Sequence, residues 1–286
     1  MSHVHLKEGI AKALFVAAAG ISILAVALIC VFLFANGVPA IAQIGLPEFL
    51  FGTTWRPAND IYGIFPMIVG SLYVTAGAMI VGVPGGLLTA LYLSRFARGR
   101  TGSFLRCGVE LLAGIPSVVY GFFGLVIIVP FVRLLGPGTG LSVLAASLIL
   151  GIMILPTVIT VAQSALDAVP SRYYEGALAL GVDHEHAVFK VVAPAAASGI
   201  MAAIVLGLGR AIGETMAVVM VAGNMPIIPD SLLSGVRTMT ANIVLEMGYA
   251  ADLHREALIA TGVVLFVFIL LITMLLNVIR KRGEAR

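Results

Sequence analysis

Six long apolar stretches constrain this chain more than any other feature of its sequence. They cover about Ala11–Ala35, Phe65–Leu93, Val109–Val132, Leu141–Gln163, Ala195–Ala222 and Ala257–Ile279. Each is long enough to cross a hydrocarbon core, which takes about 20 apolar residues in a helix. Charged residues make up 11% of the chain, well below the roughly 25% of a soluble domain. The sequence therefore predicts an all-α integral membrane protein with six transmembrane helices.

The basic residues predict how these helices are oriented, because Lys and Arg collect in the cytoplasmic loops of membrane proteins. With the N-terminus inside, the inner segments hold twelve of them: Lys7, Lys12, Arg95, Arg98, Arg100, Arg106, Arg172, Lys190, Arg280, Lys281, Arg282 and Arg286. The outer segments hold four, which are Arg56, Arg133, Arg237 and Arg255, and the remaining Arg210 lies within a span. We therefore expect both termini in the cytoplasm.

The chain divides into a short N-terminal part and a longer core. We expect residues 1–64 to form one transmembrane helix and the first outer loop, and residues 65–286 to form a core of five helices. The net charge of +3 is small, which argues against nucleic-acid binding. The sequence contains no Gly-x4-Gly-Lys-Ser/Thr nucleotide-binding loop. If ATP drives this protein, a separate chain must supply the ATPase.

One polar stretch, Asp167–Pro194, interrupts the apolar segments and is predicted to lie in the cytoplasm. It is interpreted as two helices of about ten residues, roughly 15 Å each, which are too short to span a membrane. We expect Ser171 to cap the first helix, Gly181 to end it in a left-handed conformation, and Asp183 to cap the second. Pro194 is expected to mark the next break. A hairpin of this kind must lie at the membrane surface.

Two charged residues, Arg210 and Glu214, lie within the fifth apolar stretch. A charged side chain at the centre of a bilayer costs at least about 3 kcal/mol unless it is paired or hydrated. Residues four apart share one face of a continuous helix. One interpretation is a structural ion pair that locks two helices, and the other, which we favour, is a charge pair that lines an anion pathway. Guanidinium donors match phosphate oxygens, and the carboxylate would limit how tightly an anion is held.

Hydroxyl residues near kinks are further candidates for the pathway. Thr215 directly follows the charge pair. The segment Gly114–Gly121 contains Pro116, which is expected to kink the third helix, with Ser117 and Tyr120 beside the kink. These hydroxyls either line the pathway or make buried hydrogen bonds between helices, and the sequence leaves both readings open.

Two pairs of glycines are spaced four residues apart within apolar stretches. Gly82 and Gly86 lie in the second stretch, and Gly209 and Gly213 lie in the fifth. Small residues at this spacing let two helices approach closely in a membrane. We therefore expect both pairs to lie at helix–helix contacts.

The two longest outer loops are predicted to carry structure of their own. The loop Asn36–Ile64 contains Trp55 and could lie partly in the membrane interface. The apolar residues of the loop Asn224–Arg255 suggest that it packs back onto the membrane domain. Its charged residues are interpreted as solvated, and contact with a soluble partner is the alternative. They are Asp230, Glu246, Asp252 and Arg255.

The polar hairpin resembles the EAA loop of ABC importer permeases. The residues that match are Glu175, Ala177, Gly181 and Pro194, while Gly176 and Ala193 stand where Ala and Leu are usual. The resemblance implies that the hairpin is a coupling helix that docks in a groove of a separate ATPase subunit. The coupling residues it implies are Tyr174, Glu175, Gly176, Ala177, Gly181 and Pro194.

Two further stretches look like the phosphate-specific permeases of the Pst system. They are Glu110–Leu125 (ELLAGIPSVVYGFFGL) and Gly207–Asn224 (GLGRAIGETMAVVMVAGN). The second of these, and Thr240–Ala250 (TANIVLEMGYA), are more similar to the PstC type than to its PstA-type partner. This resemblance implies the type I, MetI-like permease fold in the inner membrane of a bacterial cell.

The same resemblance implies the partners of the chain. A PstA-type permease would complete the pathway, so that Arg210 and Glu214 face that partner. Two copies of a cytosolic ATPase would bind ATP and magnesium, a periplasmic phosphate-binding protein would deliver substrate, and this chain would hold no cofactor. The sequence leaves open a PstA-type subunit, a permease for molybdate or sulfate, an ion-gradient-driven phosphate carrier, and a structural or sensory subunit.

Overall fold

The computed structural model of the protein describes residues 2–97 and 99–284. Its first half contains α1 (Ser2–Ile44), α2 (Leu46–Phe51), β1 (Trp55–Arg56), η1 (Pro57–Asn59), β2 (Ile61–Tyr62), α3 (Phe65–Leu91), η2 (Tyr92–Phe96), α4 (Gly99–Gly114), α5 (Ser117–Phe123), η3 (Gly124–Ile128) and α6 (Val129–Arg133). Its second half contains α7 (Val143–Asp167), α8 (Ser171–Ala179), α9 (His184–Ala187), η4 (Val188–Val192), α10 (Ala193–Ala195), α11 (Ala197–Gly213), α12 (Met216–Val221), α13 (Met239–Glu246) and α14 (Asp252–Glu284). The predicted all-α class is confirmed, with one small antiparallel hairpin, β1–β2, added at the first outer loop.

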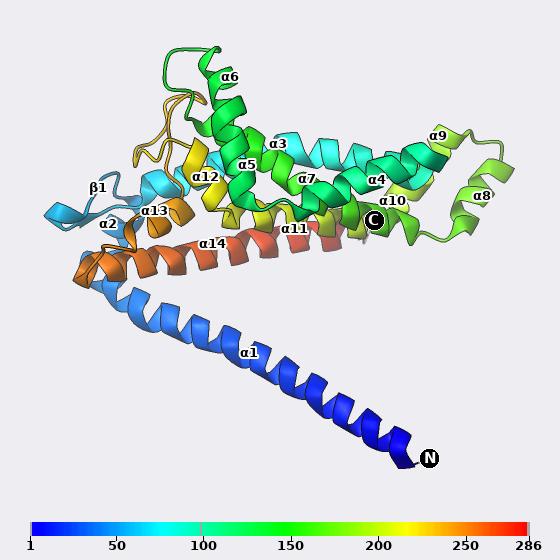
Figure 1. Cartoon of the computed structure of the whole chain (residues 1–286), viewed down its shortest axis with the longest axis horizontal. Coiled ribbons are helices and arrows are strands. Elements are labelled where there is room, and N and C mark those ends of the chain that lie inside the picture. Colours follow the sequence, from blue (N-terminus) through cyan, green and yellow to red (C-terminus); the bar gives the residue numbers. More distant parts are fainter. Residues whose placement is uncertain (1, 98, 285–286) are drawn as a thin grey trace.

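The long helices lie side by side and define two ends of the molecule. Helices α3, α7 and α11 pack against one another, and α14 packs against α11. Figure 1 shows α8 and α9 at one end, where α1 also begins and α14 also ends, and β1, α2 and α13 at the other. We call these the inner end and the outer end. Among the basic residues counted above as inner, Arg98 and Arg286 lie outside the described residues.

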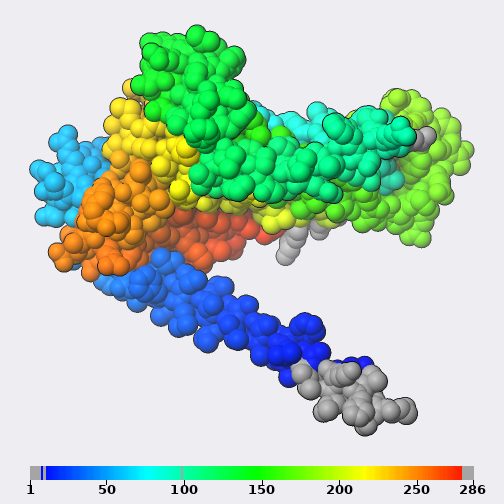
Figure 2. All heavy atoms as spheres, in the orientation of Figure 1, coloured from blue at the N-terminus to red at the C-terminus, as the bar shows by residue number. Residues whose placement is uncertain are grey.

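Helix α1 joins this body near the outer end only. A side chain at Gly37 would meet Val263 and Ala260 of α14, so the two helices touch closely there. Figure 2 shows the blue part of α1 before this contact standing clear of the body on the viewed face. Its most apolar window has a mean hydropathy of 2.8 and none of it is buried. Such a surface suits contact with lipid or with another membrane subunit.

Among the described residues, four helices are long and apolar enough to cross a membrane, and the number rises to six if each of two bent pairs is one span. The four are Ala11–Ile44, Phe65–Phe96, Val143–Asp167 and Asp252–Val278. They correspond to the first, second, fourth and sixth predicted stretches. The third and fifth stretches depart from the prediction, because neither is one continuous helix.

The third stretch is broken rather than merely kinked. Helix α4 ends at Gly114, α5 begins at Ser117, and the two directions differ by 99°. Pro116 explains the position of the break, because proline disfavours helical geometry in the residue before it and lacks a backbone donor. The glycine at position 114 adds weak helix propensity at the same place. The chain therefore changes direction sharply before α5 and α6 (Figure 1), which still pack against α7.

The fifth stretch is interrupted at both ends. The helical segment His184–Ala195 meets α11 at an angle of 71°, two residues after Pro194. At its other end α11 stops at Gly213, and α12 begins only at Met216. Glu214 between them is extended, with φ −69° and ψ 134°. The prediction of one helix over Ala195–Ala222 is therefore wrong, because the helix is interrupted at Glu214 and Thr215.

Close packing of α3 on α7 forms the centre of the body. A side chain at Gly82 would lie 2.5 Å from Ile154, and one at Gly86 would lie 2.7 Å from Val158. These glycines therefore have the predicted packing role. Nothing lies within 4 Å of the corresponding positions at Gly209 and Gly213. The prediction that Gly209 and Gly213 lie at a helix–helix contact is therefore wrong within this chain. The face of α11 that carries them is not covered by another described helix of the chain.

Candidate functional site

An open face of α11 carries the arginine that the sequence singled out. Leu206, Gly209, Arg210 and Gly213 are all exposed, and their spacing of three and four residues places them on one stripe of the helix. The opposite face of α11 is buried against the body, with Ala203, Gly207, Ala211 and Ile212. The space beside both glycines is empty, since nothing lies within 4 Å of a Cβ placed at Gly209 or Gly213.

Arg210 has no carboxylate partner among the described residues. Its Nη1 donates a long hydrogen bond of 3.4 Å to Thr157 Oγ1 on α7. Among the residues that the structure describes, no ion pair joins Arg210 to Glu214. The expectation that both share one face of a continuous helix is wrong, because the helix ends between them at Gly213. The structural ion pair that the sequence left open is therefore absent, and most of the donors of Arg210 are available.

Glu214 and Thr215 form the break itself. The Glu214 carboxylate accepts the backbone N–H of Ala217 at 3.2 Å and so caps the start of α12. The Thr215 hydroxyl donates to the Gly213 carbonyl at 3.2 Å, which satisfies a group at the end of α11. Both side chains are half-buried. The break is thus held by its own side chains and places an acidic group one turn beyond Arg210.

Ser117 and Tyr120 differ in burial and in their hydrogen bonds. Tyr120 is 5% exposed, and its hydroxyl donates to the Leu112 carbonyl at 2.8 Å, across the break between α4 and α5. The Tyr120 hydroxyl therefore makes a buried hydrogen bond that supports the break. Ser117 is half-buried at the first position of α5. Helix α5 packs on α12, where Gly121 lies close to Ala217.

The inner-end hairpin forms two short helices as predicted, although one cap differs. Pro170, not Ser171, stands at the N-cap of α8, and no side chain caps that helix. Gly181 has φ +83°, as expected for a left-handed exit. Asp183 caps α9 by accepting from the His186 backbone N–H at 2.9 Å. That hydrogen bond, together with the His186 ring, holds the pKa of the Asp183 carboxyl below its usual value.

The residues implied in coupling lie on the surface of this hairpin, with two exceptions. Glu175, Gly176, Gly181 and Pro194 are exposed, whereas Ala177 is buried. Tyr174 is half-buried, and its hydroxyl makes a 2.8 Å hydrogen bond with His184 Nδ1. Apolar side chains surround the turn, and Leu180 is 86% exposed. The hairpin is therefore internally braced and presents an apolar tip.

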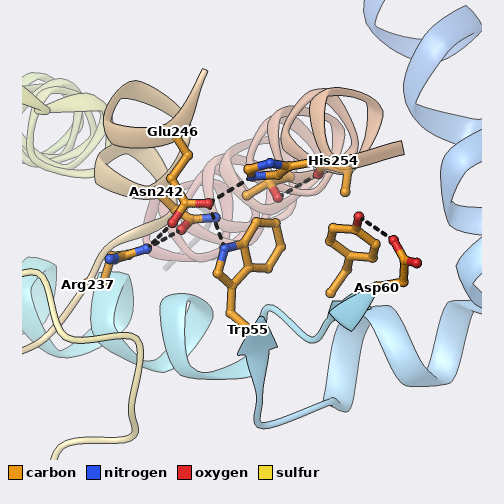
Figure 3. A network of polar contacts seen from close by, with 9 residues as sticks. Trp55, Asp60, Arg237, Asn242, Glu246 and His254 are labelled. Atoms are coloured by element: carbon orange, nitrogen blue, oxygen red, sulfur yellow. Dashed lines mark hydrogen bonds and ion pairs between the residues drawn. The ribbon is translucent and has the colours of Figure 1, made fainter. Parts of the chain in front are cut away.

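Five residues at the outer end form a buried polar cluster that the sequence did not predict (Figure 3). We call Trp55, Arg237, Asn242, Glu246 and His254 the outer cluster. Glu246 is 7% exposed, so its interpretation as a solvated charge is wrong. Its carboxylate accepts from Arg237 Nη1 at 2.6 Å and from Trp55 Nε1 at 2.9 Å, and its Oε2 lies 2.9 Å from His254 Nε2.

The outer cluster joins parts of the chain that are far apart in sequence. Trp55 lies in β1, His254 near the start of α14, and Glu246 at the end of α13. The donor and acceptor of the Trp55–Glu246 bond are 191 residues apart, so no periodic pattern in the sequence could have revealed it. The predicted packing of the loop Asn224–Arg255 onto the membrane domain is confirmed, because α13 packs against α3 and α14.

Sequence comparison assigns most of the chain to one family. Residues 82–284 match the family described as "Binding-protein-dependent transport system inner membrane component". The chain is 36% identical to the "Probable ABC transporter permease protein YqgH" of Bacillus subtilis, over 98% of this chain and 93% of that protein. It is 33% identical to the "Phosphate transport system permease protein PstC" of Mesorhizobium japonicum, over 90% of this chain and 85% of that protein.

Comparison with solved structures concerns the fold. An inward-facing structure of the MetNI methionine ABC transporter aligns with a TM-score of 0.59 and 21% sequence identity, over 80% of this chain and 99% of that chain. A second crystal form of the same transporter aligns with a TM-score of 0.57. The expected MetI-like permease fold is therefore confirmed.

Proposed function

Because this chain belongs to the family of binding-protein-dependent transport system inner membrane components, we propose that it is the PstC-type permease subunit of an ATP-driven phosphate importer. As a family member it is a multi-pass inner-membrane subunit of an ABC importer, which works with a separate ATPase and a binding protein. Such a subunit has no ATPase site and no cofactor of its own. The phosphate substrate and the PstC type are the proposal.

The observation that carries the proposal is the exposed guanidinium of Arg210 on the open face of α11. A cation that is neither buried nor ion-paired within a membrane-spanning helix is costly unless it faces water or a ligand. Its planar fork of donors matches the oxygens of an oxyanion better than a lysine would. Relatives that carry the name of phosphate permease over most of this chain support phosphate as that oxyanion.

The break after Gly213 suits a pathway in which the anion is held only briefly. Glu214 lies just beyond Arg210, and its charge opposes tight binding of a second anion near the arginine. Thr215 and Ser117 add hydroxyls at the break and at the start of α5. We assign Arg210 to direct contact with phosphate, and Glu214, Thr215 and Ser117 to the lining of the pathway. Tyr120 supports the neighbouring break from its buried position.

We assign the open face of α11 to the boundary with a PstA-type permease. Both glycines on this face lack neighbours in this chain, and small residues let a second helix approach closely. A pathway between two permeases would place Arg210 in water that the two chains enclose. Residues 65–286 would form the core that contributes this face, and residues 1–64 the N-terminal helix and outer loop.

We assign the inner-end hairpin to the docking of a cytosolic ATPase, of which two copies would bind ATP and magnesium. Its two helices are too short to span, and its tip is apolar and exposed. Tyr174 and the buried Ala177 brace the hairpin, while Glu175, Gly176, Gly181 and Pro194 are exposed. Exposed side chains on a braced element give a partner a defined surface to bind.

The proposal is tested by ATP-dependent uptake into vesicles that contain this chain, the candidate partner permease and the ATPase, with the binding protein supplied outside. We expect accumulation of radiolabelled phosphate that requires ATP and that excess sulfate or molybdate does not reduce. Equal competition by either oxyanion would assign a different cargo. The variant Arg210→Gln is expected to assemble but to take up no phosphate.

The same vesicles distinguish an ATP-driven importer from a gradient-driven carrier and from a structural or sensory subunit. An importer of this kind carries its ATPase through purification, whereas a gradient-driven carrier requires none. Uptake that continues without ATP and collapses with the proton or sodium gradient would contradict the proposal. A purely structural or sensory subunit would give no uptake under any of these conditions.

A further inference from the structure

The strongest feature outside the proposed pathway is the connection between the outer cluster and the break in the fifth span. We propose that Thr240 is a positioning residue for this break, and that the outer cluster fixes Thr240 through α13. The proposal rests on the proposed function, because it assigns the break to the transport pathway. It adds a route by which a partner seated at the outer end acts on that pathway.

Thr240 contacts the break directly. Its hydroxyl lies 3.1 Å from the backbone carbonyl of Glu214, the extended residue between α11 and α12. The first backbone bond of the next helical segment runs from the Val219 N–H to the Thr215 carbonyl. The Glu214 carbonyl is therefore one of the groups that a helix break leaves to be satisfied from elsewhere.

The direction of each hydrogen bond around Thr240 follows from counting protons. A carbonyl only accepts, so the Thr240 hydroxyl donates to Glu214. The 3.1 Å contact between the hydroxyls of Thr238 and Thr240 must then be donated by Thr238. Thr238 in turn accepts from the Ala241 N–H at 3.2 Å. Each hydroxyl thus donates once and accepts once, and the chain of bonds leads from the start of α13 to the break.

Helix α13 is fixed at both ends, so it cannot shift without breaking buried contacts. At its start, the Met239 N–H donates to Ser71 Oγ of α3 at 2.9 Å. At its end, Glu246 is held by Arg237, Trp55 and His254. The backbone groups and side chains involved are buried: Met239 and Asn242 are 0% exposed and Thr240 is 8% exposed. Helix α13 therefore forms a rigid connection between the outer cluster, which holds its end, and Glu214, which Thr240 contacts near its start. We call this connection the strut.

Arg237 of the outer cluster also connects to a surface loop that a partner can reach. Arg237 Nε donates to the Asn224 carbonyl at 2.9 Å, which closes the loop between these two residues at its base. This loop exposes the apolar side chains of Met225, Ile227 and Leu232. A binding protein that presses on the loop would act on Arg237, and through Glu246 and α13 on Thr240.

The test uses the assembled importer and two variants of one residue. Thr240→Val keeps the shape but removes the hydroxyl, which donates to Glu214 and accepts from Thr238, whereas Thr240→Ser keeps the hydroxyl. Of the two hydrogen bonds lost in Thr240→Val, only the one to Glu214 reaches the break, and loss of one buried hydrogen bond lowers the population of the arrangement it stabilises by roughly threefold to tenfold. We expect Thr240→Val to reduce the maximal rate of ATP hydrolysis stimulated by phosphate-loaded binding protein by about this factor. The concentration of binding protein that gives half of the stimulation should stay unchanged, because the docking surface is intact.

Thr240→Ser is the control that tests whether the Thr240 hydroxyl is required. Thr240→Ser should stay within about twofold of the unmodified chain, and assembly should be equal in all three. Full stimulation of Thr240→Val, or equal impairment of Thr240→Ser, would overturn the role of the hydroxyl. A change in the half-stimulating concentration instead of the maximal rate would place Thr240 in docking and not in transmission.

A double variant tests the strut as a whole. Glu246→Gln weakens the outer cluster without changing its size, and combining it with Thr240→Val should add little to either single effect, because both act through α13. Independent, additive effects would contradict the strut. If the unmodified importer hydrolyses ATP in response to its binding protein but moves no phosphate, the proposed cargo fails while this test remains valid.

Discussion

The two arginine–glutamate sets of this molecule have opposite environments. At the outer end, Arg237 and Glu246 are 2.6 Å apart, and their side chains are 15% and 9% exposed. In the fifth span, Arg210 is exposed, and Glu214 caps the next helix instead of pairing with it. The residue types are the same, so the difference lies in what the surrounding backbone allows each charge to reach.

We propose that this difference separates a structural charge from a functional one. Glu246 accepts hydrogen bonds from separate parts of the chain, and removing one partner of such a set leaves a buried charge uncompensated. Within the part of the chain that the structure describes, Arg210 has one long hydrogen bond, to Thr157, and we propose that its other donors bind groups outside this chain. We therefore expect substitutions in the outer cluster to lower stability, and substitutions at Arg210 to lower transport.

The largest effect is expected from exchanging the charges of the fifth span. The double variant Arg210→Glu with Glu214→Arg keeps the net charge but places a carboxylate on the open face of α11. Phosphate uptake should fall to background, because a carboxylate repels the anion and an arginine at position 214 no longer caps α12. The measurement is phosphate uptake per assembled complex. Uptake by the exchanged variant close to that of the unmodified chain would identify Arg210 and Glu214 as a structural pair.

The next largest effect is expected from Glu246→Ala. It leaves Arg237, Trp55 and His254 without their shared acceptor and should destabilise the protein by about 3–5 kcal/mol. Thermal unfolding in detergent measures this loss. Asp230→Ala removes an exposed acid from the same outer segment and serves as the matched control, with an expected change within about 0.5 kcal/mol. Equal shifts for both variants would contradict the structural role of the outer cluster.

A smaller effect is expected at the inner end, where two glycines of the hairpin differ in conformation. Gly181 has φ +83°, so Gly181→Ala costs roughly 1–2 kcal/mol in backbone strain. Gly176 lies within α8 with open space beside it, so Gly176→Ala should be neutral or slightly stabilising. We expect only the first to reduce the amount of phosphate moved per ATP hydrolysed. Loss of coupling in both would indicate direct contact at Gly176.

The smallest effect is expected from the cap of α9. Asp183→Ala removes the acceptor for the His186 N–H, whereas Asp183→Asn still accepts. Because the pKa of Asp183 is lowered from 3.8, its contribution is present above that pH and is lost as the pH falls through the lower value of the folded state. Hydrogen exchange of the His186 amide measures the strength of this cap. Near neutral pH the exchange should be faster in Asp183→Ala than in Asp183→Asn.

Much of the architecture could be predicted from hydropathy and local signals. The first, second, fourth and sixth stretches form long continuous helices as predicted, and Gly181 and Asp183 have the predicted turn and cap. These features depend on residues close in sequence. The family motifs likewise lie within short segments, which is why they were visible without a structure.

The breaks and the outer cluster could not be predicted in the same way. Gly213 alone is compatible with a continuous helix, and the helix ends there because Glu214, Thr215 and Thr240 satisfy the backbone groups of the break. Thr240 is distant in sequence from Gly213. The cluster around Glu246 likewise depends on Trp55 and His254, which tertiary packing brings together. Sequence periodicity contains no information on such contacts.

The central claim is that Arg210 serves transport while Arg237 serves the fold, and one matched measurement tests it most directly. Arg210→Gln and Arg237→Gln are each reconstituted with the partner permease, ATPase and binding protein, and phosphate uptake per assembled complex is measured beside the midpoint of thermal unfolding. We predict no uptake with an unchanged midpoint for Arg210→Gln, and a lowered midpoint with measurable uptake for Arg237→Gln. Normal uptake by Arg210→Gln would contradict the claim.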